Sequence, residues 1–172
     1  MCVGRLYVCS LAKVIDTVRV SGARSLVTIL TAGASAARPR EIPPERHLRV
    51  AVSDIDAPRE GHVLPGAEHV ERLLSFFEKW DRRDPLLIHC YAGVSRSPAA
   101  AFIAACALAP ERAEIDIARD LRRASPTATP NRRLVTLADH TLGRKGRMVA
   151  AITEIGRGAE CFEGAPFKLE LE

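Results

Sequence analysis

Apolar and polar residues alternate in blocks that predict strands and helices in turn along the first half of the chain. Short runs rich in β-branched residues are typical of buried strands, and they occur at residues 6–9, 25–30, 47–52 and 85–88. Apolar residues recur at helical spacing after Ser10, a suitable N-cap, and again across 66–80. Strands that alternate with helices favour an α/β fold with a mainly parallel central sheet and helices on both faces.

The second half of the chain has a helical pattern. An Ala-rich run and three amphipathic runs predict helices at 99–109, at 111–124, after Asn131 and at 148–155. The segment from about residue 156 onward has no such pattern, and we expect this C-terminal tail to be loose. With no internal repeat and no linker, residues 1–172 are expected to form a single domain.

Composition narrows the function classes. A chain of 172 residues with 47% hydrophobic content can bury one sizeable core. Its net charge of +4 suits an anionic substrate but is too small to indicate nucleic-acid binding. The longest apolar run, 99–110, is too short to span a bilayer, and no signal peptide is evident. We therefore expect neither nucleic acid nor membrane as a partner.

The number and spacing of the cysteines favour neither a disulfide framework nor a metal site. There are five of them, without regular spacing, which does not resemble a disulfide framework. No C-x-x-C pair and no paired Cys/His spacing suggests zinc, so neither a metal nor another cofactor is expected. These features favour a reducing, cytoplasmic setting.

One stretch, residues 89–97, carries the chemistry. Cys90 and Arg96 stand six positions apart, between a predicted strand and a predicted helix that has Pro98 in its first turn. The free N–H groups and positive dipole of a helix N-terminus can bind a phosphate, and Gly93 permits the backbone turn that such a cradle needs. Arg96 offers a planar fork for two phosphate oxygens. A thiolate from Cys90 beneath that phosphate would be a nucleophile aimed at phosphorus.

The same stretch resembles the signature of the cysteine-dependent protein tyrosine phosphatases. His89-Cys90, five residues, then Arg96 and Ser97 match it, and Ser95-Arg96-Ser97 is closest to the dual-specificity branch. The resemblance implies that Cys90 attacks phosphorus in a fold of the protein tyrosine phosphatase type. It also implies that the phosphate oxygens bind the loop residues Tyr91, Ala92, Gly93, Val94, Ser95 and Arg96.

The resemblance also implies roles for three neighbouring residues. Ser97 would donate to the leaving thiolate, although a serine here could instead cap the helix. His89 would order the loop and stabilise the thiolate. Asn131 resembles a Pro-Asn element beside the loop in dual-specificity enzymes, and as an N-cap it needs no catalytic role.

The leaving oxygen needs a proton, and two aspartates are candidates for the general acid. In the resembled family an aspartic acid on a loop upstream of the cysteine has this role. Asp54 directly follows a predicted strand, 36 residues before Cys90, and is the first choice; Asp56 is the alternative acid. Either could instead be a solvated loop carboxylate.

Three functions are compatible with these residues. The first is a phosphomonoesterase, a protein-tyrosine or dual-specificity phosphatase that acts on a phosphorylated protein or peptide through a cysteinyl phosphate. The second is a non-catalytic phosphate-binding module of the same fold. The third is a thiol-based arsenate or sulfur-transfer enzyme, which would need a resolving cysteine, and Cys106 is expected to lie too far along the next helix. The basic stretch 119–147 could receive a polyanion, although a solvated helix face is the commoner meaning of such a run.

Overall fold

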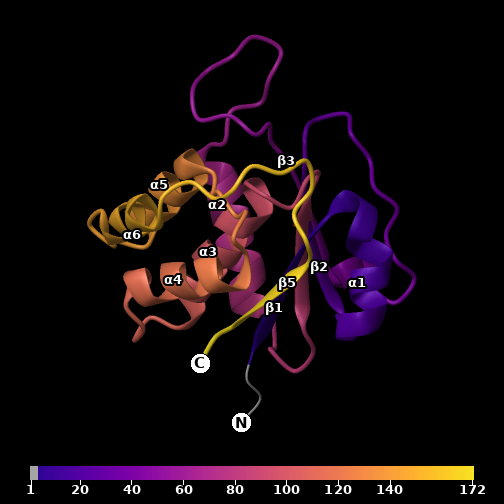
Figure 1. Ribbon diagram of the computed structural model, residues 1–172. Coiled ribbons are helices and arrows are strands. Elements are labelled where there is room, and N and C mark those ends of the chain that lie inside the picture. The colour runs from indigo at the N-terminus through magenta and orange to yellow at the C-terminus, as the bar shows by residue number, and fades with distance from the viewer. Residues whose placement is uncertain (1–3) are drawn as a thin grey trace.

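A computed structural model describes residues 4–172, and Figure 1 shows its elements. The strands are β1 (Arg5–Ser10), β2 (Ser25–Leu30), β3 (His47–Ala51), β4 (Leu86–Cys90) and β5 (Phe167–Glu170). The helices are α1 (Val14–Ser21), α2 (Ala67–Lys79), α3 (Arg96–Leu108), α4 (Glu114–Ala124), α5 (Arg132–Thr141) and α6 (Arg147–Ile155), with short 3₁₀ turns at Leu11–Lys13 and Pro44–Arg46.

The strands form one twisted sheet in the order β3-β2-β4-β1-β5. The first four are parallel to one another, and β5 runs antiparallel to β1. Helix α1 covers one face of the sheet and the other helices lie on the opposite side (Figure 1). The prediction of a mainly parallel sheet with helices on both faces is confirmed.

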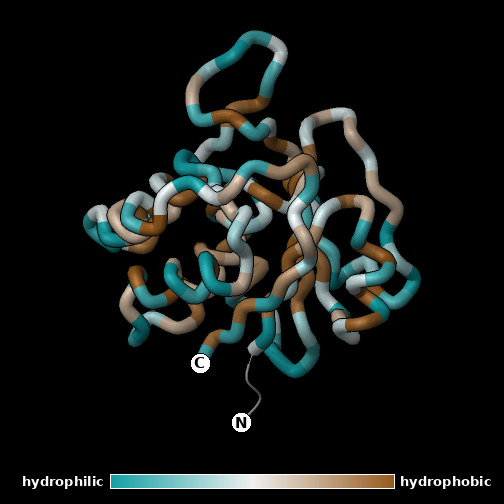
Figure 2. The backbone as a smooth tube through the Cα atoms, viewed as in Figure 1, coloured by the Kyte–Doolittle hydropathy of each residue, from teal (hydrophilic) through white to brown (hydrophobic). Residues whose placement is uncertain are grey.

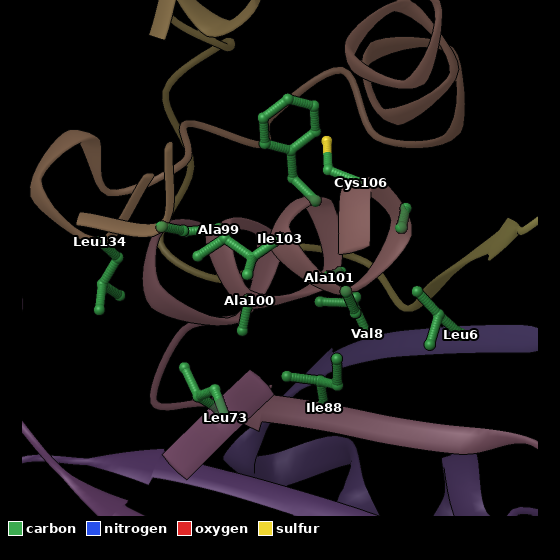
Figure 3. Packing of buried hydrophobic residues seen from close by; sticks show 14 of the residues in the cluster. Leu6, Val8, Leu73, Ile88, Ala99, Ala100, Ala101, Ile103, Cys106 and Leu134 are labelled. Carbon is green, nitrogen blue, oxygen red and sulfur yellow. The ribbon is translucent and has the colours of Figure 1, made fainter. Parts of the chain in front are cut away.

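Helix α3 lies at the centre of the core. Its residues from Arg96 to Cys106 are all buried, which explains why this run is apolar on every side rather than amphipathic. Ala100 and Ala101 face Val8 and Ile88 of the sheet in Figure 3. Because alanine side chains are small, the helix can approach the strands closely and hold the loop that precedes it. The tube in Figure 2 has brown stretches along the strands, whereas its outer loops are a mixture of teal, white and pale brown with shorter brown stretches.

The C-terminal tail differs from its prediction. The segment after residue 156 was expected to be loose, but it crosses the molecule and ends in β5, paired with β1 (Figure 1). Phe167, Leu169 and Leu171 are buried while Lys168 and Glu170 are exposed. This alternation is the period of a half-buried strand, and burial of the three apolar side chains offsets the entropy of ordering the tail.

Two helix starts also differ from the sequence prediction. Helix α3 begins at Arg96 rather than at residue 99, so the motif arginine belongs to its first turn. Ser10 precedes a 3₁₀ turn and makes no side-chain cap; its hydroxyl donates to the Glu163 carboxylate instead. A carboxylate brought in by the tail thus competes successfully with the local capping site.

The four parallel strands end at the same edge of the sheet. Their last residues are Ser10, Leu30, Ala51 and Cys90, so the segments that follow them meet above that edge. None of the helices within residues 4–172 is long and apolar enough to cross a membrane.

Candidate active site

The loop between β4 and α3, residues 91–95, has the conformation of an anion cradle. Gly93 has φ +71°, a left-handed conformation that glycine adopts without strain. A Cβ at Gly93 would lie 2.8 Å from the carbonyl carbon of Cys9 and from the backbone nitrogen of Ser10. The loop therefore packs directly on the end of β1, and only glycine fits at its centre.

The carbonyl groups of this loop are bound on its outside. Four backbone N–H groups donate to them: Leu11 to Tyr91 (3.0 Å), Gly164 to Ala92 (2.9 Å), Thr129 to Val94 (2.8 Å) and Asn131 to Ser95 (3.1 Å). Peptide units whose carbonyls point outward direct their N–H groups toward the loop centre. Three distant chain segments thus preorganise the amides that could hold an anion.

The nucleophile candidate lies at the base of the loop. Cys90 is buried as the last residue of β4, and its Sγ lies 3.1 Å from the Oγ of Ser97. Ser97 is also buried and lies inside α3, so its hydroxyl does not cap the helix. A hydroxyl in this position can donate to a thiolate.

The guanidinium group of Arg96 is hydrogen-bonded through Nη1 but not through Nε. Its Nη1 donates to the Val52 carbonyl at 2.9 Å and to the Thr31 hydroxyl at 3.3 Å. Its Nε is buried and has no hydrogen-bond partner within residues 4–172. A buried donor without a partner costs roughly 1–3 kcal/mol, and a bound oxyanion would supply the missing acceptor.

The two candidate acids differ in their contacts. Oδ1 of Asp54 accepts a hydrogen bond from the Ser95 hydroxyl at 2.7 Å and from the Asn131 amide at 2.9 Å. Asp56 is exposed and makes no side-chain hydrogen bond or ion pair within residues 4–172. Asp54 is therefore fixed beside the loop 91–95, whereas nothing in the described chain directs Asp56 toward it.

Asn131 connects three parts of the site. Its Oδ1 accepts from the Leu134 N–H and caps α5, as the sequence predicts. Its Nδ2 donates to Asp54 and, at 3.3 Å, to the Ile55 carbonyl, while its backbone N–H donates to Ser95. The cap and the contact with the candidate acid are thus made by the same side chain.

His89 belongs to a buried chain of hydrogen bonds. Its Nδ1 lies 3.2 Å from the Cys90 carbonyl, and its Nε2 lies 2.8 Å from the Thr28 hydroxyl, which also lies 2.8 Å from Nε2 of His47. Burial lowers the pKa of His89 to about 4, and the charges of Arg49 and Arg96 act in the same direction. The imidazole is therefore neutral near pH 7.

The direction of this chain follows from the carbonyl, which can only accept. Nδ1 of neutral His89 must carry the hydrogen, so its Nε2 accepts from Thr28, and the Thr28 oxygen accepts from Nε2–H of His47. His89 is consequently held in one tautomer, with its Nδ1–H on the Cys90 carbonyl and its Nε2 on the Thr28 hydroxyl. Both ring nitrogens are engaged, so neither is free for proton transfer.

The basic stretch is mostly engaged in structure. Arg122 donates to the carbonyls of Ser125, Pro126, Ala128 and Gly156, and Arg133 donates to the Pro65 carbonyl. Arg119 pairs with Glu154, and both Arg144 and Arg147 pair with Glu114. These partners favour a structural role for the stretch over a polyanion site.

Several site residues carry no sequence signal. Thr28, Thr31, Thr129 and Gly164 lie far from the motif in sequence, and their residue types are common in strands and loops. They reach the phosphate loop only because the strand ends converge and the tail returns across them. Within residues 4–172, His, Cys, Asp and Glu side chains form no group of three or more that could hold a metal ion.

Comparison of the fold with solved structures finds several close matches. Human DUSP28 superposes with a TM-score of 0.60 at 20% identity, over 81% of this chain and 89% of that one. The Cydia pomonella PTP-2 phosphatase also gives 0.60 at 20% identity, over 78% and 84% of the two chains. The chain has the dual-specificity phosphatase fold. The expected fold is thereby confirmed.

The solved structures that share this fold are not all described as phosphatases. The human tyrosine phosphatase-like serine/threonine/tyrosine-interacting protein superposes with a TM-score of 0.62 at 14% identity, over 81% of this chain and 92% of that one. The sequence itself matches no family model and no curated protein. At such low identity the neighbours establish the fold, and the activity must be argued from the site.

Proposed function

We propose that the protein is a phosphomonoesterase of the protein-tyrosine or dual-specificity type, acting on a phosphorylated protein or peptide. One observation carries this proposal: the buried Nε of Arg96 has no hydrogen-bond partner within residues 4–172, and it adjoins a loop in which four carbonyls accept hydrogen bonds from other segments. The site is electrostatically incomplete until an oxyanion with several acceptor oxygens binds. A phosphate monoester next to a cysteine sulfur fits that requirement.

The reaction proceeds in two displacements at phosphorus. In the first, the Cys90 thiolate forms the S–P bond while the ester P–O bond breaks, and Asp54 gives its proton to the leaving oxygen. In the second, the Asp54 carboxylate takes a proton from water, whose oxygen attacks phosphorus as the S–P bond breaks. Ser97 donates to the departing thiolate. Arg96 and the loop amides stabilise the charge on the equatorial oxygens in both steps.

Two alternatives are less well supported. A binding module without turnover has no need of a carboxylate fixed beside the cradle, yet Asp54 is held there by Ser95 and Asn131. A sulfur-transfer or arsenate enzyme needs a second thiol near Cys90. Cys9 lies on β1 next to β4, but burial raises the pKa of its thiol to about 12. Cys106 lies ten residues beyond Arg96 on α3, about 15 Å along the helix axis, and burial raises its pKa to about 12 as well.

The test is turnover of an aryl phosphate and of a phosphotyrosyl peptide by the wild type and by Cys90→Ser. We expect wild-type turnover that EDTA does not inhibit, and none above background with Cys90→Ser, because an alcohol there is rarely ionised. Rapid quench should trap a phosphorylated Cys90. The variant should still bind phosphate, which calorimetry can measure.

A Cys90→Ser enzyme with near wild-type turnover would end the proposal. Phosphate binding by a wild-type protein that hydrolyses none of the substrates would favour the binding module instead.

A further inference from the structure

The C-terminal crossing segment, residues 156–166, forms one border of the phosphate loop. It leaves α6, passes over the loop edge and enters β5, as the yellow trace in Figure 1 shows. The Gly164 N–H donates to the Ala92 carbonyl, and a Cβ at Gly164 would lie 3.0 Å from the Gly93 carbonyl oxygen. The segment is therefore in direct contact with the loop that the proposed function assigns to phosphate.

A groove of about 630 Å³ separates the outer part of this segment from the phosphate loop. Val94 lines it from the loop side, Thr129 lines it beside Val94, and the wall opposite comes from residues 157–162. Because Val94 belongs to the phosphate loop itself, the groove borders the proposed active site. The residues next to a bound phosphorylated residue are thus candidates to occupy it.

The groove wall has free backbone groups. Gly158 and Ala159 are fixed, since their N–H groups donate to the Thr129 hydroxyl and to the Pro126 carbonyl. In contrast, the N–H and C=O groups of residues 160–163 have no hydrogen-bond partner within residues 4–172. The chain bends at Phe162 and Glu163, and its exposed backbone groups can hydrogen-bond to the main chain of a bound peptide.

Two exposed aromatic side chains lie on the segments involved. Among the five exposed large hydrophobic side chains of the described residues, Tyr91 belongs to the phosphate loop and Phe162 lines the groove. Tyr91 is 70% exposed and Phe162 is fully exposed. Exposed aromatic side chains at the edge of a binding site can contribute to an interaction surface.

The charges in the crossing segment exclude one kind of ligand. Glu160 pairs with Arg157 in a solvent-exposed contact of 3.3 Å, and Glu163 accepts from the Ser10 hydroxyl. Arg157 and Glu160 both line the groove and pair with each other, so the groove offers no net positive charge to acidic side chains or additional phosphate groups. The groove thus suits an apolar peptide segment better than an acidic one or a polyphosphate.

We propose that this groove binds, in extended form, the residues next to the phosphorylated residue of a protein substrate, with an apolar side chain against Phe162. The inference rests on the proposed phosphatase function and adds the sequence preference of its substrate. Phe162 is the specificity residue, and the free backbone of 160–163 supplies hydrogen bonds that do not depend on sequence.

The test uses phosphotyrosyl peptides that differ only in having Leu, Ala or Glu at the positions flanking the phosphotyrosine, together with an aryl phosphate. The wild type should prefer Leu to Ala and Ala to Glu in kcat/KM. Phe162→Ala should lower the ratio of kcat/KM for the Leu peptide to that for the aryl phosphate by about tenfold, and Phe162→Leu should restore most of it. The matched control is Val20→Ala, which removes an 88% exposed apolar side chain on α1 and should leave both values unchanged.

A second arm tests the charges. Glu160→Lys should raise kcat/KM for the Glu peptide by about threefold or more, as expected for replacing repulsion by attraction at an exposed site, whereas Asp16→Lys on α1 should not. The inference is wrong if Phe162→Ala behaves like Val20→Ala, if it lowers both substrates equally, or if inositol polyphosphates are better substrates than every peptide.

Failure of the proposed function would look different. If the wild type does not hydrolyse even the aryl phosphate, the same peptides can be bound to Cys90→Ser and to Cys90→Ser/Phe162→Ala and their Kd values compared by fluorescence anisotropy. A tenfold higher Kd of the Leu peptide for the double variant would support peptide binding in the groove even if the protein has no catalytic activity. Equal Kd values would overturn the inference.

Discussion

The two ends of helix α3 each hold an arginine, and their surroundings are opposite. Arg96 lies at the N-terminal end, where the helix dipole is positive, and it has no ion-pair partner within residues 4–172. Arg144 lies at the C-terminal end, where its Nη2 donates to the Cys106 carbonyl at 2.7 Å and its Nη1 contacts Glu114 at 3.1 Å. The dipole favours a cation only at the second of these ends.

The pairing of charges differs between the two ends of α3, and this difference distinguishes a stabilising cluster from a candidate binding site. The cluster of Arg144, Glu114 and Arg147 is complete: charges are paired and a free helix carbonyl is satisfied. The Arg96 end is incomplete, since a buried cation faces the positive end of a dipole and one of its donors has no acceptor in the part of the chain that the structure describes. The same residue type therefore indicates a structural clamp in one place and a binding site for an anion in the other.

The largest expected effect is a loss of turnover when Arg96 is exchanged for lysine, compared with the same exchange at Arg144. Lysine keeps the charge but loses the planar fork, so Arg96→Lys should lower kcat for an aryl phosphate by about a hundred- to a thousandfold, as for a lost transition-state donor. Its melting temperature should change little. Arg144→Lys is the control and should show the reverse: nearly wild-type kcat with a lower Tm. Equal kcat values for the two variants would mean that Arg96 does not face the substrate.

The acid beside Arg96 should show an effect that depends on the leaving group. Asp54→Asn should slow a phosphopeptide by about a hundredfold and an activated aryl phosphate much less, because a good leaving group departs without a proton. The alkaline limb of its pH–rate profile should flatten. Asp56→Asn is the matched control, and a leaving-group dependence in that variant instead would transfer the role to Asp56.

Removing the charge from Glu114 should destabilise the other end of α3 without touching catalysis. Glu114→Gln leaves the half-buried Arg144 without a counter-charge, and we expect a loss of about 3 kcal/mol in the free energy of unfolding. Urea titration measures it, and kcat at a temperature well below the transition should stay near the wild-type value. A large loss of kcat in a folded variant would contradict the separation of the two ends.

The smallest effect concerns pH and the neutral histidines below the loop. Burial lowers the pKa of both His89 and His47 from the ordinary 6.5 to about 4, with Arg49 contributing in each case. At a pH between about 4 and 6.5, these histidines bind more protons in the unfolded chain than in the folded one. The free energy of unfolding must therefore fall as the pH drops from about 6.5 toward 4. The loss at pH 4.5 should be on the order of 2 kcal/mol from His89.

Denaturant titrations from pH 7 to pH 4.5 would measure that loss. His47→Asn should reduce the pH dependence by removing one of the two groups. A flat curve for the wild type would show that the histidines are not neutral in the folded protein.

Much of this protein was readable from its sequence. The strand runs, the helix run after Cys90 and the Asn131 cap predict the α/β architecture, because local hydrophobic periodicity reports which face of each element is buried. The motif from His89 to Ser97 also placed Cys90 and Arg96 at the two ends of one loop, since its spacing is set by covalent connection alone. For the tail, the alternation at Phe167, Leu169 and Leu171 was present but too short to outweigh the expectation of a loose end.

The surroundings of the loop 91–95 follow from the tertiary structure and not from the local sequence. The sequence ranks Asp54 ahead of Asp56 only by its place directly after a strand; the contacts of Asp54 with Ser95 and Asn131, 41 and 77 residues away, give a second reason for that order. Likewise, the Gly164 contact with the loop depends on β5 pairing with β1 across nearly the whole chain. Such contacts are non-local: they depend on where the packing of the whole sheet brings each segment, and no local pattern of residues encodes that.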